Sequence, residues 1–234
     1  MNNNRFSVDN LFIETTRKCN MECSHCLRGD AQNKSISPNY IDVLFEKLLS
    51  IDILTITGGE PSLEPTIINQ IIHHAKKYEI IIYNFYIATN AKKITDEFLE
   101  GIKRLFLYCK DNTISNLKWS NSPWHEVINR ENIEKLKIFP FFSQKYSTMF
   151  QKTNKSLQAQ GRATKIGGRN SICETFKIHN NKIYNCELYL NCFGNMIDGC
   201  NWSYSSQNKR ENIICSIYDF SLKNMKEFID RNKT

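Results

Sequence analysis

The sequence lacks any apolar run long enough to cross a membrane. Its longest run, residues 80–88, is interrupted by Asn84 and falls far short of the roughly 20 residues that a membrane-spanning helix needs. The start of the chain, residues 1–5, lacks the apolar core of a secretion signal. Hydrophobic residues make up 41% and charged residues 24% of the 234, which excludes a disordered chain, a collagen and a simple coiled coil. We therefore expect a soluble, cytoplasmic protein without a membrane partner.

Acidic residues are absent between Lys135 and Cys173, although the whole chain has 24 of them against 31 lysines and arginines. The same stretch carries eight basic residues, while the net charge of the whole chain is +7. Such a concentration of positive charge suits an anion: a phosphate, an acidic peptide or a nucleic acid. A solvated surface explains the same composition equally well.

Cysteine, by contrast, is abundant, with nine residues in a chain that has no secretion signal. In that context a metal or redox role is favoured over a disulfide framework. Three cysteines lie between Cys19 and Cys26, and five lie between Cys173 and Cys215. The remaining one, Cys109, is expected in the core. The two clusters predict two metal centres, or one centre and a set of buried thiols.

Over residues 1–170 the apolar pattern predicts strands that alternate with helices. The expected strands are 11–16, 52–57, 80–88, 115–120 and 138–142, and the expected helices are 37–49, 64–77, 95–105 and 131–137. Such alternation is typical of a parallel sheet covered by helices. Ligands of these α/β folds bind at the carboxyl ends of the strands.

The pattern changes after residue 170, where short strands and turns replace the helices. Two hairpins are expected, at residues 176–184 and 188–197, with turns at Asn180-Asn181 and Gly194-Asn195. An amphipathic helix over residues 218–231 closes the chain, capped by Asp219 or Ser221. We therefore divide the chain into residues 1–170 and a small cysteine-rich extension, residues 171–234.

The first cysteine cluster has the spacing Cys19-x3-Cys23-x2-Cys26 and directly follows the first strand. Three thiolates of one tight loop can bind three irons of a cubane cluster, which leaves the fourth iron open for a ligand. The second strand ends in Gly58-Gly59-Glu60-Pro61. Glycines let a ligand approach the backbone closely, and Glu60 offers a carboxylate to an ammonium group.

Together, these two motifs resemble those of radical S-adenosylmethionine (SAM) enzymes. The resemblance implies a partial (β/α)6 barrel over roughly residues 8–170 and a catalytic [4Fe-4S] cluster held by Cys19, Cys23 and Cys26. It also implies reductive cleavage of SAM to a 5′-deoxyadenosyl radical, which abstracts a hydrogen from the substrate, and an electron donor of the flavodoxin or ferredoxin type.

The resemblance assigns cofactor-binding roles to seven further residues. Gly58, Gly59 and Glu60 match the segment that binds the methionine amino group, and the backbone of His25 matches a position near the adenine. The set is completed by Asn90 of the pair Thr89-Asn90, by Ser120, and by Arg162 of Gly161-Arg162-Ala163. This arginine can pair with a carboxylate. Turn chemistry explains Thr89, Asn90 and Ser120 as well. His125 is either a proton relay or an ordinary loop histidine.

The second cysteine cluster resembles the start of a SPASM or twitch extension, which holds an auxiliary [4Fe-4S] cluster. The candidate ligands are Cys173, Cys186 and Cys200, with either Cys192 or Cys215 as the fourth. A zinc site and unligated buried thiols remain alternatives for this cluster.

Three functions follow from these observations. The first is modification or oxidation of a peptide or protein side chain, which the cysteine-rich extension favours by analogy. The second is a radical dehydrogenase or rearrangement catalyst for a small anionic metabolite, a sugar or nucleotide, which the basic stretch favours. The third is a non-catalytic nucleic-acid-binding protein. We do not expect a nucleic-acid partner, because Gly58-Gly59-Glu60-Pro61 has no role in that interpretation.

Overall fold

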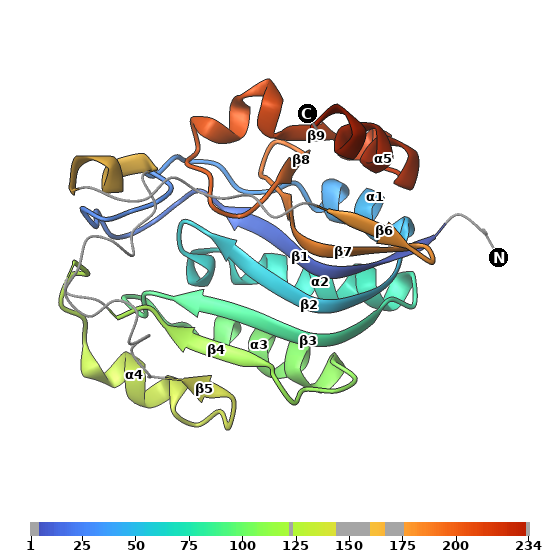
Figure 1. The fold of residues 1–234 in the computed structure, drawn as a ribbon. Helices are drawn as coiled ribbons and strands as arrows, with labels where there is room; N and C mark the ends of the chain where they lie inside the picture. Colours follow the sequence, from blue (N-terminus) through green and yellow to red (C-terminus); the bar gives the residue numbers. More distant parts are fainter. Residues whose placement is uncertain (1–4, 122–123, 144–159, 167–175, 233–234) are drawn as a thin grey trace.

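The computed structural model describes residues 5–121, 124–143, 160–166 and 176–232, except the side chains of residues 185 and 186. One sheet runs through the molecule, in the order β5-β4-β3-β2-β1-β7-β8-β9, and β6 pairs with β7 (Figure 1). Its first five strands are β1 (Phe6–Thr16), β2 (Leu48–Gly58), β3 (Ile81–Thr89), β4 (Asn116–Trp119) and β5 (Phe142–Ser143). They pair in parallel. The predicted parallel sheet is confirmed.

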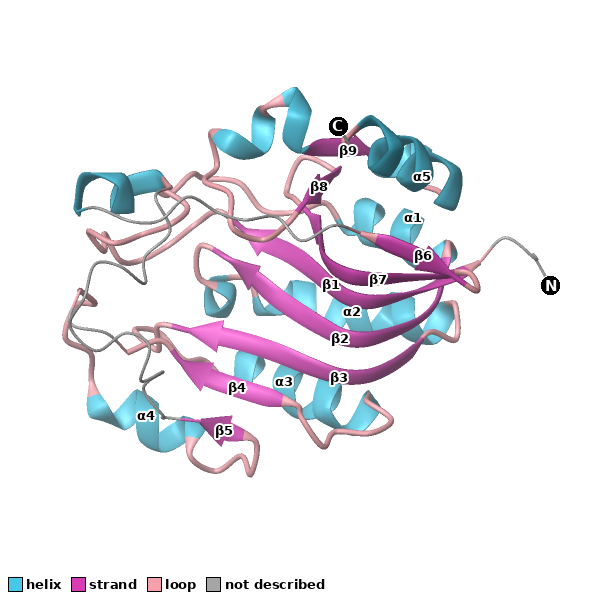
Figure 2. Ribbon diagram, in the orientation of Figure 1, coloured by secondary structure: helices cyan, strands magenta, loops and turns pink. Residues whose placement is uncertain are grey.

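Helices cover one face of this parallel part (Figure 2). They are α1 (Pro38–Glu46), α2 (Pro65–Lys77) and α3 (Asp96–Tyr108), while α4 (Arg130–Leu136) precedes β5. Their apolar faces join the strands in one buried cluster. Local sequence determines where the helices begin: α1 and α2 each have a proline in the first turn, and the Thr95 hydroxyl at the start of α3 accepts from the Phe98 amide. None of the described helices is long and apolar enough to cross a membrane.

Several predicted boundaries are wrong: β1 and β2 begin four to five residues before their expected starts at residues 11 and 52, and α5 (Leu222–Arg231) begins four residues after its expected start at 218. The expected helix 37–49 ends at Glu46, because Leu48 already pairs with Phe6 of β1 as the first residue of β2. Leu48 is fully buried and Leu49 is 45% exposed, which is the alternation of a strand. The expected strand 138–142 begins only at Phe142, because Ile138 lies in a turn with 70% of its surface exposed.

The C-terminal hairpins continue the same sheet beyond β1. Strand β7 (Lys182–Leu190) pairs in parallel with β1 from Ser7 to Ile13. Strands β8 (Asn195–Asp198) and β9 (Ile213–Ser216) follow in antiparallel order, and β6 (Lys177–His179) forms the first hairpin with β7. Asn180 and Asn181 both have positive φ, as their predicted turn requires. The division at residue 170 stays a prediction, since residues 167–175 lie outside the described part.

The chain closes with α5 (Leu222–Arg231), as the sequence predicts. Of the two expected caps, Ser221 is the one used: its hydroxyl accepts from the Asn224 amide. Met225 and Phe228 bury the apolar face of this helix.

Candidate active site

The cysteine loop leaves the carboxyl end of β1, where the predicted site lies. Cys19, Cys23 and Cys26 are half-buried free thiols. The amide of Cys26 donates to the Cys23 carbonyl at 3.1 Å, which closes a tight turn between them. All three cysteines therefore belong to one short loop beside the end of β2.

The two glycines at the end of β2 pack against the chain that enters this loop. The Gly59 amide donates to the Thr16 carbonyl at 2.7 Å, and the Glu60 amide donates to the Lys18 carbonyl at 2.9 Å. A Cβ atom on Gly58 would lie 2.1 Å from the Thr16 oxygen, and one on Gly59 would lie 2.2 Å from the Lys18 oxygen. The absence of side chains is thus required by the protein's own backbone, and not only by an approaching ligand as the sequence suggested.

Glu60 is 1% exposed and is already hydrogen-bonded within the protein. Its Oε1 accepts from the Ser62 amide at 3.0 Å and from Thr89 Oγ1 at 2.7 Å, and its Oε2 accepts from the Asn90 amide at 2.7 Å. Burial raises the pKa of Glu60, while these hydrogen bonds act to lower it. The carboxylate ties the end of β2 to the end of β3. Contact with an ammonium group stays a prediction.

Asn90 continues this connection into the cysteine loop. Its Nδ2 donates to Asn20 Oδ1 at 2.9 Å and lies 3.9 Å from the Cys19 sulfur. Ser120 follows β4 at the same edge of the sheet, where its amide donates to the Thr89 carbonyl at 2.8 Å. The ends of β1, β2, β3 and β4 therefore meet around the loop, as the sequence predicts for ligand-binding residues of a parallel sheet.

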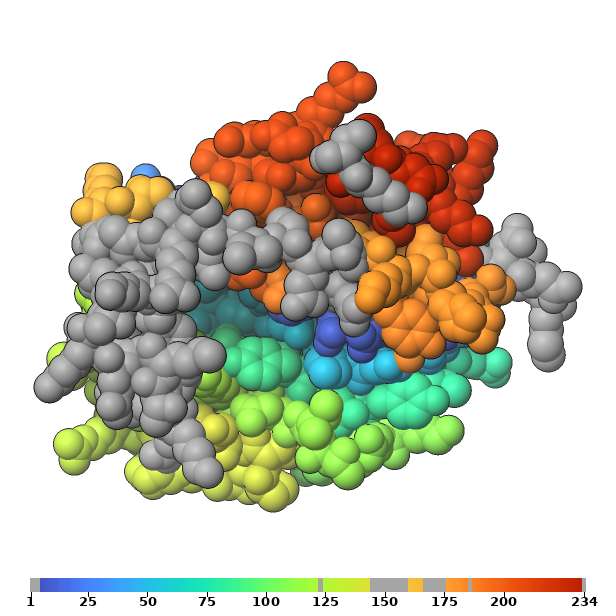
Figure 3. All heavy atoms as spheres, in the orientation of Figure 1, coloured from blue at the N-terminus to red at the C-terminus, as the bar shows by residue number. Residues whose placement is uncertain are grey.

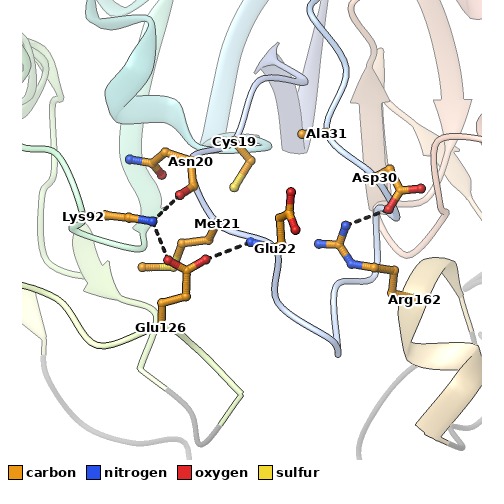
Figure 4. A pocket seen from close by; sticks show the side chains of 9 residues that line it. All are labelled: Cys19, Asn20, Met21, Glu22, Asp30, Ala31, Lys92, Glu126 and Arg162. Carbon is orange, nitrogen blue, oxygen red and sulfur yellow. Dashed lines mark hydrogen bonds and ion pairs between the residues drawn. The ribbon is translucent and has the colours of Figure 1, made fainter.

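A cavity of about 590 Å3 opens beside Cys19 (Figure 4). This volume lies within the roughly 300–1,000 Å3 of small-molecule sites. One wall carries Lys92, which donates to the Asn20 carbonyl at 2.7 Å and pairs with Glu126. The opposite wall carries Arg162, whose Nη1 lies 2.8 Å from Asp30 Oδ1. Sequence analysis predicted Arg162 but missed Lys92, Glu126 and Asp30, which no motif marks.

Gly161 and Arg162 hold the cysteine loop from a segment about 135 residues further along the chain. The Arg162 amide donates to the Cys26 carbonyl, and its Nε donates to the Cys23 carbonyl, both at 2.9 Å. Gly161 has a positive φ of 55°, and a Cβ there would lie 2.4 Å from the Leu27 oxygen. The Gly-Arg pair therefore fixes the backbone of two of the three cysteines.

His25 lies in the loop between two aromatic neighbours. Its ring stacks on Trp124 with centroids 5.3 Å apart and meets His125 edge-on at 4.8 Å. Burial lowers the pKa of His25 to about 4, helped by His125 and Arg162. The imidazole is therefore neutral at pH 7. The segment that carries His125 does lie against the cysteine loop, but a proton relay stays a prediction.

The donor set of the loop fits an iron–sulfur cluster in kind and number. Burial raises the pKa of Cys19 and of Cys23, and the thiolate charges of their neighbours raise it further. A cation bound between them would reverse this effect, since metal ions stabilise thiolates. Across the described residues, no group of three histidine, cysteine or acidic side chains converges closely enough to hold a metal ion. The loop therefore supplies three thiols of the right kind, but in this structure their sulfur atoms do not converge on a common metal position.

The second cysteine cluster is only partly described. Cys173 lies outside the described residues, and Cys186 belongs to β7 without a described side chain. Cys192 is fully buried, with its thiol donating to the Glu14 carbonyl at 3.2 Å. Cys215 lies on β9 opposite Met196 and packs on the core, and Cys200 follows β8. This placement argues against Cys192 as a ligand, because its thiol and its amide are already bonded to Glu14.

Glu14 forms the centre of a buried network that sequence analysis missed. Its carboxylate accepts from Arg17 Nε at 2.6 Å, from the Tyr189 hydroxyl at 2.7 Å and from the Cys192 amide at 3.0 Å. Burial acts to raise the pKa of Glu14, but the Arg17 guanidinium leaves it below its usual value. The Arg17 guanidinium also lies 4.3 Å from the ring centre of Tyr204. The network joins β1, just before the cysteine loop, to the C-terminal strands.

Comparison with known proteins identifies the class of domain that this site belongs to. Residues 13–115 match the model of the Radical SAM superfamily. The uncharacterized protein MJ0907 of Methanocaldococcus jannaschii is 29% identical over 102 residues, which make up 42% of this chain and 36% of that protein. The matched segment contains both the cysteine loop and the Gly58-Gly59-Glu60 turn, so this part of the chain is similar to the radical SAM domain of an enzyme superfamily. The match spans well under half of the curated relative.

Solved structures share the fold across most of the chain. The structure of anSMEcpe with bound AdoMet (SAM) and the Kp18Cys peptide has a TM-score of 0.60 at 11% identity, covering 96% of this chain and 83% of anSMEcpe. SuiB of Streptococcus suis bound to S-adenosylmethionine has a TM-score of 0.53 at 12% identity, covering 95% of this chain and 64% of SuiB. Identities this low establish the fold alone. The α/β class, with an open parallel sheet as in a partial radical SAM barrel, is confirmed.

Proposed function

We propose that this chain cleaves SAM reductively and uses the resulting radical to abstract a hydrogen from a peptide or protein side chain. The observation that carries the proposal is the meeting of three free thiols with the Gly58-Gly59-Glu60 turn beside a cavity, inside the matched domain. When bound, a [4Fe-4S] cluster and SAM would supply the electron and the 5′-deoxyadenosyl radical. Cys19, Cys23 and Cys26 would hold that cluster.

The chain's own residues position these groups. Arg162 holds the carbonyls of Cys23 and Cys26, and Asn90 holds the loop beside Cys19. Glu60 keeps the ends of β2 and β3 together by accepting hydrogen bonds from Thr89 and Asn90. Rigid placement of this kind is what a protein contributes to reactions in which cofactors supply the chemistry.

A peptide or protein substrate is favoured by the likeness to anSMEcpe, whose structure holds the Kp18Cys peptide. The second candidate is a dehydrogenase or rearrangement catalyst for a small anionic sugar or nucleotide, favoured by the basic stretch from Lys135 to Cys173. A donor of the flavodoxin or ferredoxin type would supply the electron in both cases. A cytoplasmic location fits this chemistry, since cytosolic thiols stay reduced.

We further propose an auxiliary [4Fe-4S] cluster in the C-terminal extension. Cys186 belongs to β7 and Cys200 follows the end of β8, so both lie toward the same end of the β7–β8 hairpin. Residues at one end of a hairpin can share one metal centre. Cys173 and Cys215 are the remaining candidates, now that Cys192 is engaged with Glu14. Iron analysis tests this: about eight iron atoms per chain are expected for two clusters and about four for one.

The decisive experiment is 5′-deoxyadenosine formation by anaerobically reconstituted, reduced protein. We expect the native chain to form it and Cys26→Ala to abolish it together with the iron–sulfur absorption of the loop cluster. Cys109→Ala is the matched control, because Cys109 is a buried thiol outside the loop. Persistent turnover by Cys26→Ala, or zinc in place of iron in the native chain, would overturn the proposal.

A further inference from the structure

The carboxyl-terminal half of the sheet has a second face, opposite the helices. Residues facing the helices are buried and apolar: Leu11, Ile13, Leu54, Ile56, Phe85, Ile87 and Leu117. Because side chains alternate along a strand, Tyr86 of β3 and Asn116 and Lys118 of β4 lie on the other face. Figure 3 shows this face as a hollow floored by the strands coloured blue to green. The half-buried residues of β3 and β4 therefore lie on the face of the sheet that helices α1, α2 and α3 leave uncovered.

Register brings three of these side chains together. Tyr86 lies directly opposite Asn116, and Lys118 lies opposite Ala88, two residues further along β4. Two residues of a strand span about 7 Å, so long side chains at these positions can reach one group between them. Of the three, Lys118 lies closest to the carboxyl end of β4, which ends at Trp119, and the cofactor-binding residues are expected at that end.

Within the described part of the chain, each of these three side chains has a polar group without a hydrogen-bond partner. Asn116 Oδ1 is buried and has no partner. Neither the Tyr86 hydroxyl nor the Lys118 ammonium group contacts a described polar group. Buried polar groups are nearly always bonded, so the unbonded Asn116 Oδ1 is a candidate contact for a ligand. Burial raises the pKa of Tyr86, which keeps its hydroxyl protonated as a donor.

No described carboxylate forms an ion pair with Lys118. No aspartate or glutamate occurs between Lys135 and Cys173. Of the acidic residues described near the loop, Asp30 pairs with Arg162, and Glu126 pairs with Lys92. The Lys118 ammonium is therefore free, within the described part of the chain, to pair with an anion of a bound molecule.

We propose that Tyr86, Asn116 and Lys118 form a subsite for an acidic residue of a peptide substrate, which rests on the function proposed above. The Lys118 ammonium and the Tyr86 hydroxyl donate to the substrate carboxylate, and Asn116 Oδ1 accepts an N–H of the substrate backbone. These contacts use one cation, one neutral donor and one acceptor, which together match an acidic residue and its own amide group.

Binding of two small probes tests this subsite without turnover. The full chain, reconstituted anaerobically, is titrated with N-acetylglutamate amide and with the neutral N-acetylglutamine amide, and binding is followed by NMR. We expect the acidic probe to bind at least about tenfold more tightly, as expected for a charge-assisted hydrogen bond. Lys118→Met should abolish this preference, and Lys118→Arg should retain part of it. Lys103→Met is the matched control, because Lys103 is an exposed lysine of α3.

Equal affinity for both probes, no saturable binding of either, or an unchanged preference in Lys118→Met would overturn the subsite. A loss of SAM affinity in Lys118→Met, with probe binding intact, would assign the lysine to the cofactor and also overturn it. Tyr86→Phe gives a second test should Lys118→Met fail to fold, with a loss of acidic-probe affinity expected. A chain that binds the acidic probe but never cleaves SAM would refute the proposed function and leave the subsite standing.

Discussion

Replacing Arg17 with methionine should cost several kcal/mol of stability, because it leaves the Glu14 carboxylate without its cation. The two side chains are 1% and 0% exposed and lie 2.6 Å apart. Breaking a buried pair by removing one partner costs about 3–5 kcal/mol. Tyr189 and Cys192 would still donate to Glu14, so we expect a loss near about 3 kcal/mol. Since native proteins are stable by only about 5–15 kcal/mol, urea unfolding followed by circular dichroism would detect it readily.

The double variant Arg17→Met, Glu14→Gln separates the lost ion pair from lost packing. If the uncompensated charge causes the destabilisation, the double variant should be more stable than Arg17→Met alone. Lys77→Met provides a control, because its ion pair with Asp42 is largely exposed and should contribute little. A loss below about 1 kcal/mol in Arg17→Met, or a double variant less stable than both single variants, would refute this account of the network.

Three further predictions follow from the same contacts. The pKa of Glu14 is lowered from its ordinary value of 4.5. The ionised carboxylate therefore stabilises the fold fully above that pH, and this stabilisation is lost as the pH falls through the lower pKa of the folded state. Urea unfolding of the native chain and of Arg17→Met at pH 2–6 measures the effect. Gly59→Ala places a Cβ 2.2 Å from the Lys18 oxygen, and should lower stability by about 1–3 kcal/mol and reduce the iron bound by the loop on reconstitution. Cys192→Ala should leave the iron content unchanged, since its thiol already donates to Glu14.

Each of these predictions has its own control and contrary outcome. If the free energy of unfolding of Arg17→Met falls with decreasing pH as steeply as that of the native chain, Glu14 is not the source of this pH dependence. For the glycine, Gly101→Ala is the matched change, because its Cβ would have 3.5 Å of room in α3; an iron content unaltered in Gly59→Ala would contradict the packing argument. Loss of about four irons in Cys192→Ala would show that this thiol is a cluster ligand after all.

The helices and strands were largely predictable because their signals are local. β-branched residues predicted β2, the apolar run of residues 80–88 predicted β3, and apolar spacing predicted the helix 95–105 that the structure shows as α3. Leu48 was misplaced because an apolar residue at that position continues the helical spacing of α1 as well as it begins a strand. Pairing with Phe6 of β1 decides between the two, and that contact spans more than forty residues of sequence.

The location of the candidate site was predictable, but several residues that line it, and most contacts within it, were not. The cysteine spacing and the Gly58-Gly59-Glu60 turn correctly indicated a shared location at the carboxyl ends of β1 and β2. The sequence could not show that the glycines pack against the backbone at Thr16 and Lys18. Nor could it show that the Glu60 carboxylate accepts hydrogen bonds from Thr89 and Asn90 at the end of β3. Both facts depend on how neighbouring strands end relative to one another, which no local pattern encodes.

The parallel pairing of β7 with β1 was the least predictable feature, and it gives the last prediction. A chain shortened to residues 1–170 would lose the strand that pairs with β1 from Ser7 to Ile13. It would also lose the donors that Tyr189 and Cys192 provide to Glu14. The shortened chain would thus combine an unpaired strand edge with a buried carboxylate that keeps only part of its hydrogen bonds. We expect it to show no cooperative urea transition and to retain less iron than the full chain on reconstitution. A cooperative transition with the stability of the full chain would instead establish residues 1–170 as an independent domain.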